Sequence, residues 1–196
     1  MVKRVIDIIG SIFGLIFLLP FLPFVTLAII LESGLPVFVK LDRISSGKVI
    51  KVYKFRTMVR NAHALKKDLK SLNERKDGPF FKIKNDPRLT KMGKFLRKLR
   101  LDEFPQFFNV LKGELSLVGP RPHEPEEILA YPLEFKKLYF AKGGLTGLSQ
   151  VSGASALPFT KELEYDLFYV EHQSFWLDSK ILFKTIAIFF FDPTGV

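Results

Sequence analysis

The sequence predicts a mainly helical α+β fold, with a helix–break–helix membrane segment at the N-terminus and a compact domain after it. Residues 8–31 are uncharged and mostly apolar, and Pro20 and Pro23 interrupt them. After this segment the apolar residues first alternate as in short strands and then recur at the wider spacing of amphipathic helices. We therefore divide the chain into a membrane anchor over residues 1–36 and a membrane-associated domain over residues 37–196.

The composition limits the kinds of protein that this chain can be. Its 196 residues include 30 Lys and Arg against 20 Asp and Glu, a net charge of +10. That balance favours an anionic partner: a nucleic acid, an acidic membrane surface or a phosphorylated substrate. The absence of cysteine excludes a disulfide scaffold, a CxxC redox site and a cysteine zinc site.

The apolar segment is long enough to cross a bilayer, but its prolines divide it. As one straight helix it would measure about 36 Å, against a hydrocarbon core of about 30 Å. Pro20 and Pro23 lie near its middle, where each removes a backbone donor and clashes with the preceding turn. Basic residues flank both ends, and the positive-inside bias would hold both flanks on the cytoplasmic face. A re-entrant hairpin satisfies both observations; a kinked single span and a cleaved signal peptide are the alternatives.

The domain begins with a predicted β-hairpin. Residues 37–39 and 49–57 have the composition of short strands, and a Ser-Ser-Gly turn over residues 45–47 separates them. Lys54 and Arg56 alternate with aromatic residues, so that both cations would share one face of the second strand.

Helices follow the hairpin. Apolar periodicity predicts them over residues 61–75, 90–99, 103–112, 163–170 and 178–191. Gly113 is placed to end the third of these helices. The basic amphipathic helix over residues 90–99 is typical of a segment that docks on anionic headgroups, and equally of a solvated face over a core.

The segment around Asp102 carries the strongest chemical signal. Asp102 falls where a helix N-cap belongs, and a helix start offers backbone donors to phosphate oxygens. Arg97 and Arg100 add full charges nearby, so we expect the pKa of Asp102 to be lowered. An ionised aspartate beside a bound phosphate could attack phosphorus. The alternative is an ordinary helix cap, with Glu103 complementing the helix dipole.

Two downstream segments are further candidates for ligand contact. Arg121 lies between Pro120 and Pro122, whose rings stiffen the backbone that presents a guanidinium for bidentate phosphate contact. The glycine-rich residues 143–150 carry small hydroxyl side chains that could wrap a ligand. The alternatives are a rigid surface turn for the first segment and a tight connection for the second.

Together these segments resemble the small monotopic phosphoglycosyl transferases, bacterial sugar transferases that begin the assembly of polysaccharides and glycoprotein glycans. The resemblance covers nearly the whole chain, in the order of the family's motifs. The matching pieces are Lys3-Arg4 with Asp7, the proline-broken segment, KFRTM at 54–58, NDPR at 85–88, LDEFPQ at 101–106, NVLKGE at 109–114, SLVGPRP at 116–122 and GLTGLSQV at 144–151. The chain departs from the family pattern at Leu19, where serine often precedes the proline, and at Ile44, where glycine is usual.

The resemblance implies an Mg²⁺-dependent enzyme that transfers a sugar-1-phosphate from a UDP-sugar to polyprenol phosphate, usually undecaprenyl phosphate, and releases UMP. It implies a covalent intermediate on Asp102, with Glu103 as its partner and both carboxylates as candidate Mg²⁺ ligands. Arg97 and Arg121 match phosphate-binding arginines of the family. Further candidates for substrate contact within the matching motifs are Lys54, Arg56, Pro122, Thr146 and Gln150.

The resemblance also implies a location and a set of partners. The protein would be monotopic, re-entrant at Pro20 and Pro23, on the cytoplasmic face of the bacterial inner membrane. Its expected partners are a UDP-sugar, the polyprenol phosphate and the membrane, without nucleic acid, and a homodimer is left open. The competing hypothesis is a membrane-tethered basic adaptor that binds anionic lipid or nucleic acid without catalysis.

Overall fold

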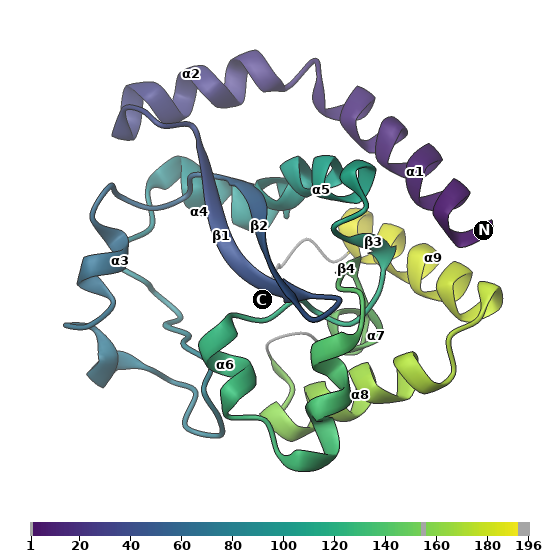
Figure 1. Ribbon diagram of the computed structural model, residues 1–196. Helices are drawn as coiled ribbons and strands as arrows, with labels where there is room; N and C mark the ends of the chain where they lie inside the picture. The colour runs from purple at the N-terminus through teal and green to yellow at the C-terminus, as the bar shows by residue number, and fades with distance from the viewer. Residues whose placement is uncertain (1, 154–155, 192–196) are drawn as a thin grey trace.

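The computed structural model describes residues 2–153 and 156–191; residues 192–196 of the predicted membrane-associated domain lie outside the described residues. Helices predominate, as expected (Figure 1). In chain order, the helices described are α1 (Val2–Leu18), α2 (Leu22–Ser33), α3 (Ala62–Leu65), α4 (Lys91–Lys98), α5 (Phe107–Lys112), α6 (Pro125–Leu129), α7 (Leu148–Val151), α8 (Phe159–Glu171) and α9 (Phe175–Phe191). The 3-10 helices are η1 (Lys70–Leu72), η2 (Leu101–Gln106) and η3 (Leu133–Phe140). The strands are β1 (Phe38–Ser45), β2 (Lys48–Phe55), β3 (Ser116–Val118) and β4 (Gly144–Thr146).

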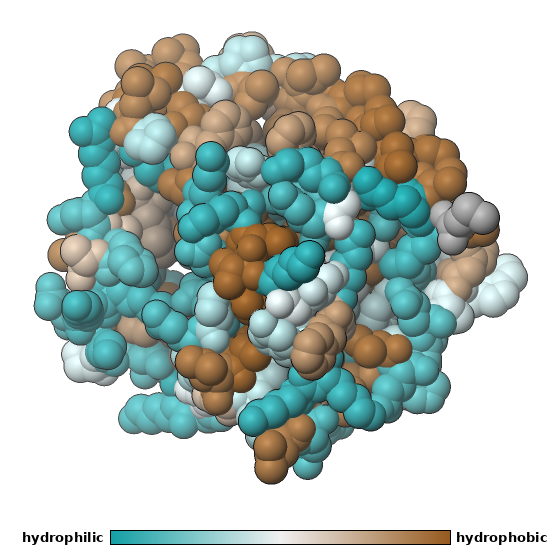
Figure 2. All heavy atoms as spheres, viewed as in Figure 1, coloured by the Kyte–Doolittle hydropathy of each residue, from teal (hydrophilic) through white to brown (hydrophobic). Residues whose placement is uncertain are grey.

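The anchor is a bent pair of helices, α1 and α2, broken where the prolines predict. Pro20 lies in the break and Pro23 in the first turn of α2, and the two axes differ by 62°. Among the described residues, no helix alone has the length and apolarity of a membrane span; α1 and α2 meet that test only as a bent pair. The pair runs along one edge of the molecule in Figure 1, and Figure 2 shows apolar surface over the same edge.

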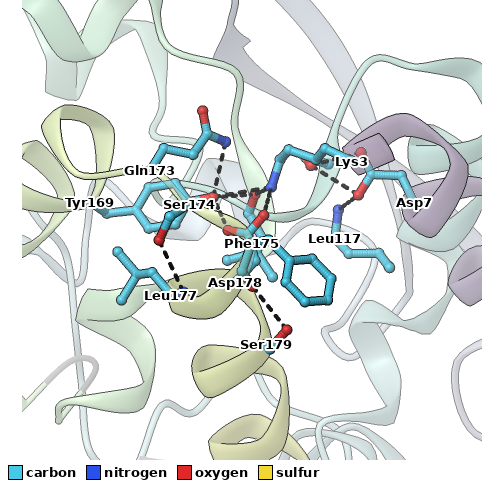
Figure 3. Close-up of polar contacts among 12 residues, drawn as sticks. Lys3, Asp7, Leu117, Tyr169, Gln173, Ser174, Phe175, Leu177, Asp178 and Ser179 are labelled. Atoms are coloured by element: carbon cyan, nitrogen blue, oxygen red, sulfur yellow. Dashed lines mark hydrogen bonds and ion pairs between the residues drawn. The ribbon is translucent and has the colours of Figure 1, made fainter. Parts of the chain in front are cut away.

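The charged residues in the first turns of α1 form hydrogen bonds and an ion pair with the rest of the protein. The Lys3 ammonium donates to Asp178 Oδ2 (2.6 Å), the Tyr169 hydroxyl (3.1 Å) and a backbone carbonyl of β3 (Figure 3). The Arg4 guanidinium donates to two carbonyls at the end of α5, each at 2.6 Å. The Asp7 carboxylate, 3% exposed, accepts from Ser116 Oγ and from the Leu117 N–H at 2.8 Å.

We call Lys3, Arg4, Asp7 and these partners the docking cluster. From the sequence, Lys3 and Arg4 were predicted to set membrane orientation and, with Asp7, matched a family motif. In the structure both are bonded to the domain, so they also fix the start of α1 against β3, α5 and α9.

The predicted hairpin is confirmed, with a longer first strand than expected. β1 and β2 pair antiparallel from Phe38↔Phe55 to Ser45↔Lys48. The connecting residues Ser46 and Gly47 both have positive φ (53° and 71°), which fits the tight turn of a two-residue hairpin loop.

A second, parallel pair of strands was not predicted. β3 pairs with β4 through Ser116↔Gly144 and Val118↔Thr146. Residues 144–146 had been interpreted only as part of a glycine-rich loop. The backbones of β4 and of the residue after β3 lie very close together. A Cβ atom added at Gly144 would be only 2.1 Å from the backbone nitrogen of Gly119. Such short strands, far apart in sequence, carry no local periodicity that could predict their pairing.

One helix prediction is wrong. Residues 61–75 contain only the short α3 and η1, joined by turns. Of the expected apolar stripe Ala62, Leu65, Leu69 and Leu72, only Ala62 is buried. A helix takes most of its stability from packing an apolar face, and this stripe has little to pack against.

The other four predicted helices lie where the periodicity places them, with shifted ends, whereas α6, η3 and α7 were not predicted. α4 begins after Thr90, whose hydroxyl accepts the Gly93 N–H at 2.9 Å. α8 and α9 are each longer than predicted. The segment predicted as one helix over residues 103–112 divides into η2 and α5, and Gly113 in the left-handed region (φ 81°) ends it.

The apolar core positions the site from two sides. One cluster buries Leu96 of α4 together with Phe55 of β2 and residues of the anchor. Another buries Val110, Val118 and Tyr169, and so joins α5, β3 and α8. The segment between α4 and α5 is held at both ends by these clusters, and it carries Asp102 and Glu103.

Candidate active site

The chain turns sharply at Arg100, just before the two candidate carboxylates. Arg100 has a left-handed backbone (φ 54°) and is the residue that precedes η2. Asp102 and Glu103 therefore occupy the first turn of a 3-10 helix, and Asp102 is not the N-cap that the sequence predicted. The reason is that α4 continues to Lys98 and leaves no room for a new extended cap before Asp102.

Asp102 is a buried carboxylate, with 6% of its surface exposed. Burial raises its pKa, the charge of Glu103 adds to this, and Lys54 and Arg97 offset only part of the shift. The expected lowering of the Asp102 pKa is therefore wrong, because the loss of solvent outweighs the cations. Among the described residues, no other side chain donates a hydrogen bond to this carboxylate.

Glu103 lies in a different environment, although it is the next residue. Its Oε1 accepts from the Lys54 ammonium at 2.5 Å. Burial by itself would raise the pKa of Glu103, but the charges of Lys54 and Arg121 more than offset burial and lower the pKa to about 2. The pKa values of the two neighbouring carboxylates are thus shifted in opposite directions. Such a difference is typical of groups with different chemical roles.

Glu103 opens onto a small polar pocket of about 30 Å³. The residues that line it are Arg43, Val52, Lys54, Glu103, Gln106, Arg121, Pro122, Gly144, Leu145 and Gln150. Three cations thus face a single carboxylate in this lining. Because the excess charge is positive, the pocket favours an anion, and the guanidinium groups are suited to phosphate.

The structure brings together some of the predicted substrate-contact residues. Lys54, Arg121, Pro122 and Gln150 line the pocket together with Glu103. These five residues come from four separate segments of the chain. Arg97 does not line it; its Nε donates to Thr57 Oγ1 at 3.1 Å, and its charge acts on Asp102.

The other two candidates are placed away from the pocket. Arg56 follows the end of β2, and its guanidinium donates to the Gly34 carbonyl and to Ser33 Oγ at the end of α2. It therefore does not share a site with Lys54. Thr146 is buried, and its hydroxyl bonds that of Thr185 in α9 at 2.7 Å.

Comparison with known proteins identifies the family. The model of the family described as bacterial sugar transferase matches residues 1–192. The chain belongs to this family. The resemblance inferred from the motifs is thereby confirmed.

Curated relatives of this chain are named for the transfer of several different sugars. An undecaprenyl-phosphate galactose phosphotransferase of Salmonella typhimurium is 40% identical over 193 residues, which cover 95% of this chain and 40% of that protein. A UDP-glucose:undecaprenyl-phosphate glucose-1-phosphate transferase of Klebsiella pneumoniae is 41% identical over 197 residues, 94% of this chain and 39% of that protein. The uncharacterized sugar transferase EpsL of Bacillus subtilis is 37% identical over 185 residues, 94% of this chain and 85% of that protein. The chain thus spans about two fifths of the first two relatives and most of the third.

The pocket includes two polar residues that were not predicted to contact substrate, Arg43 and Gln106. Arg43 had been counted only among the charges that flank the anchor. A signal was available: Arg43 lies two residues before the Ser-Ser-Gly turn, where a side chain at the end of a hairpin can reach the loops around it.

Gln150 presents an acceptor without a partner. Its Nε2 donates to the Leu145 carbonyl at 3.3 Å, and this contact fixes the orientation of the amide. Its Oε1 is buried, and no donor among the described residues reaches it. A buried acceptor without a partner costs about 1–3 kcal/mol. Gln150 is one of the residues that line the pocket, so the pocket wall contains an acceptor that the described residues leave without a partner.

The carboxylates fit a magnesium ion only together with a substrate. No three His, Asp, Glu or Cys side chains of the described residues cluster as a self-sufficient metal site. Mg²⁺ is commonly held by one or two carboxylates with waters and substrate phosphates. Asp102 and Glu103 provide such a pair, and one Glu103 oxygen is already bonded to Lys54.

Proposed function

We propose that this protein transfers a sugar-1-phosphate from a UDP-sugar to undecaprenyl phosphate at the cytoplasmic face of a bacterial membrane. The single observation that carries the proposal is the pairing of a buried carboxylate that no other side chain of the described residues hydrogen-bonds, Asp102, with a cationic pocket that begins at the next residue, Glu103. The names of the relatives support the same reaction class, because both fully named relatives above are undecaprenyl-phosphate sugar transferases.

In the first step an Asp102 oxygen attacks the phosphorus that bears the sugar. A new bond forms between this oxygen and phosphorus, and the bond from phosphorus to the bridging oxygen breaks, so that UMP leaves with the electron pair. Arg121 and Arg43 are placed to bind the negative oxygens of the diphosphate in the pocket. The attacking form is the ionised carboxylate, which the charges of Lys54 and Arg97 favour. Burial raises the pKa of Asp102 and so disfavours this form, but it also leaves the carboxylate with little hydration to be lost on attack.

In the second step an oxygen of the lipid phosphate attacks the same phosphorus. The bond to Asp102 breaks, the carboxylate is regenerated, and the product is undecaprenyl diphosphate carrying the sugar. Glu103 remains ionised in both steps, because its pKa is about 2 and Lys54 pairs with it. Mg²⁺, held by Asp102 and Glu103 with the diphosphate, would neutralise charge on the phosphate oxygens.

The second substrate requires access to the bilayer, and the anchor is suited to provide it. Large apolar side chains of α1 and α2 are exposed, including Phe13 (68%), Phe24 (74%) and Leu31 (78%). The far end of α9 adds Phe190 and Phe191. An exposed apolar surface of this extent is characteristic of a membrane contact. We therefore propose that α1 and α2 form a re-entrant hairpin in one leaflet.

UMP release by the purified full chain tests the reaction. With undecaprenyl phosphate and a panel of UDP-sugars, at least one donor should give UMP, and Asp102→Asn should lower the rate about 10⁴-fold or more because the nucleophile is lost. Mass spectrometry after incubation with donor alone should find a phosphosugar on Asp102. Asp68→Asn, an equivalent change at an exposed position, is the matched control and should keep the wild-type rate.

A normal rate for Asp102→Asn would overturn the assignment of the nucleophile. Binding of undecaprenyl phosphate without UMP release from any donor would instead favour the competing adaptor hypothesis. That hypothesis explains the net charge of +10, but it gives no reason for a buried aspartate beside the pocket.

Cysteine labelling tests the re-entrant arrangement, and the chain contains no native cysteine that would interfere. Val2→Cys, Leu19→Cys and Leu129→Cys place single thiols at exposed positions in the start of α1, the bend and α6. A membrane-impermeant maleimide should label positions 2 and 129 from the same side of the membrane, and position 19 from neither side. Labelling of position 2 from the opposite side would show a single span.

A further inference from the structure

A buried carboxylate outside the pocket ties together two segments that line it. Asp166, in the middle of α8, is 1% exposed. Its Oδ2 accepts the backbone N–H of Arg121 at 3.1 Å, and its Oδ1 accepts the hydroxyl of Ser149 at 2.7 Å. Arg121 lines the pocket, and Ser149 precedes Gln150, which also lines it.

The same two segments approach each other through their backbones. The Gly119 N–H donates to the Thr146 carbonyl at 2.9 Å, and the Gly144 N–H donates to the Pro120 carbonyl at 2.8 Å. These bonds fix the segments up to Pro120. The N–H of the next residue, Arg121, is bonded to Asp166. This carboxylate therefore provides the next hydrogen bond that holds the backbone, at the residue that carries the guanidinium.

Asp166 has no cation within ion-pair distance among the described residues. The carboxylate of Glu162 lies on the same helix and is paired with Arg75 at 2.5 Å. Burial of a carboxylate without a paired cation is costly. The contacts that offset this cost at Asp166 are the two hydrogen bonds to the pocket segments.

We propose that Asp166 is a positioning residue for the donor phosphate: by holding the Arg121 N–H and the Ser149 hydroxyl, it sets the direction in which the Arg121 guanidinium enters the pocket. The inference rests on the proposed function, because it assumes that Arg121 binds the diphosphate. Arg121 itself is exposed, so its side chain has little packing of its own to hold it in place.

A double-mutant cycle between the two residues tests the inference. Asp166→Leu is close to aspartate in shape but leaves the Arg121 N–H without an acceptor. It should lower kcat/KM for the UDP-sugar about tenfold or more, mainly through KM. In an Arg121→Ala background the same change should cost nothing further, because the guanidinium that it positions is gone. A purely structural defect would lower kcat/KM by the same factor in both backgrounds and would overturn the inference.

Two milder variants keep the test valid if Asp166→Leu folds poorly. In Asp166→Asn, the amide oxygen can accept from Arg121 and the NH₂ can donate to Ser149, so kcat/KM should stay within about threefold of wild type. Ser149→Ala should also stay within about threefold. The combination should lose about threefold more than the product of the single effects, because nothing then orients the amide. Strict additivity, or a loss in Asp166→Asn as large as in Asp166→Leu, would overturn the inference.

Failure of the inference and failure of the proposed function give different results. If Arg121→Ala is impaired and Asp166→Leu is not, the positioning role alone is wrong. If Arg121→Ala keeps the wild-type kcat/KM, the phosphate contact in the proposed function is wrong, and the inference is overturned with it.

Discussion

The docking cluster of α1 and the pocket beside Glu103 differ in how completely their polar groups are paired within the protein. In the docking cluster every charged side chain has defined partners: Lys3 bonds Asp178, Arg4 bonds two carbonyls, and Asp7 bonds a hydroxyl and an N–H. Asp7 is buried and Lys3 and Arg4 are partly buried, and such fully paired groups are what a structural joint requires.

In the pocket, by contrast, polar groups are left over. Of its three cations, Lys54 pairs with Glu103 and Arg43 with Glu124 outside the lining. Among the described residues, Arg121 has no ion pair and the Gln150 Oε1 has no partner. An incomplete set of partners marks a place where a ligand completes the bonding. The comparison teaches that changes in the docking cluster should affect stability, whereas changes in the pocket should affect substrate binding.

The largest expected effect is on stability, from Asp7→Ala. This change removes the acceptor of the Leu117 N–H and the Ser116 hydroxyl in a site that is 3% exposed. We expect the free energy of unfolding to fall by about 3 kcal/mol. The midpoint of thermal unfolding in detergent should fall by roughly 5–10 °C.

The matched control for Asp7→Ala is Asp42→Ala. Asp42 pairs with Lys51 at 2.5 Å, but both side chains are largely exposed (47% and 59%). An exposed pair of this kind contributes about 1 kcal/mol or less, so the midpoint should hardly move. Equal shifts in the two variants would show that the docking cluster is no more important for stability than a surface ion pair.

Several elements could be predicted because they depend on neighbouring residues. Pro20 lies at the break of the anchor and Gly113 ends α5, each as the backbone geometry of that residue predicts. The turn of the β-hairpin is likewise a property of adjacent residues. The family motifs also supplied Lys54 and Arg121 as candidate contact residues, and both line the pocket.

The errors concern properties that depend on distant residues. The acidity of Asp102 follows from its burial by elements that the sequence does not place, so a count of nearby cations gave the wrong direction. The role of Asp166 was missed for the same reason, although a signal existed. Asp166 shares a helix face with Phe159 and Leu163, which are both buried.

Asp166 shares a property with each of the two regions. Its carboxylate is hydrogen-bonded within the protein, as in the docking cluster, but it has no paired cation among the described residues. Burial raises its pKa to about 7, against about 3.9 in an unfolded chain. The folded state therefore keeps a proton that the unfolded state releases, and the free energy of unfolding should fall as the pH rises through this window.

The variant Asp166→Asn isolates this effect, because other buried carboxylates titrate in both proteins. Between pH 5 and pH 7, the variant should gain about 2 kcal/mol of stability relative to wild type. Denaturant unfolding at both pH values measures the difference. A difference that does not change with pH would mean that Asp166 is ionised throughout this range.

The smallest expected effect is on substrate binding, from Arg43→Gln. Arg43 lines the pocket and also lies 3.2 Å from Glu124. Glu124 keeps a second partner, Lys66 at 3.3 Å, so loss of Arg43 should leave the unfolding midpoint almost unchanged. The KM for the UDP-sugar should rise about tenfold, because one phosphate-binding cation is lost.

The chain offers a matched control in Lys66→Gln. This change removes the other partner of Glu124, and Lys66 does not line the pocket. Its KM should equal that of wild type, since the loss of a partly exposed ion pair is worth about 1 kcal/mol or less and lies outside the site. If Lys66→Gln raised KM as much as Arg43→Gln does, the effect would come through Glu124 and α6. The positive charge of Arg43 in the pocket would then not be what binds the donor.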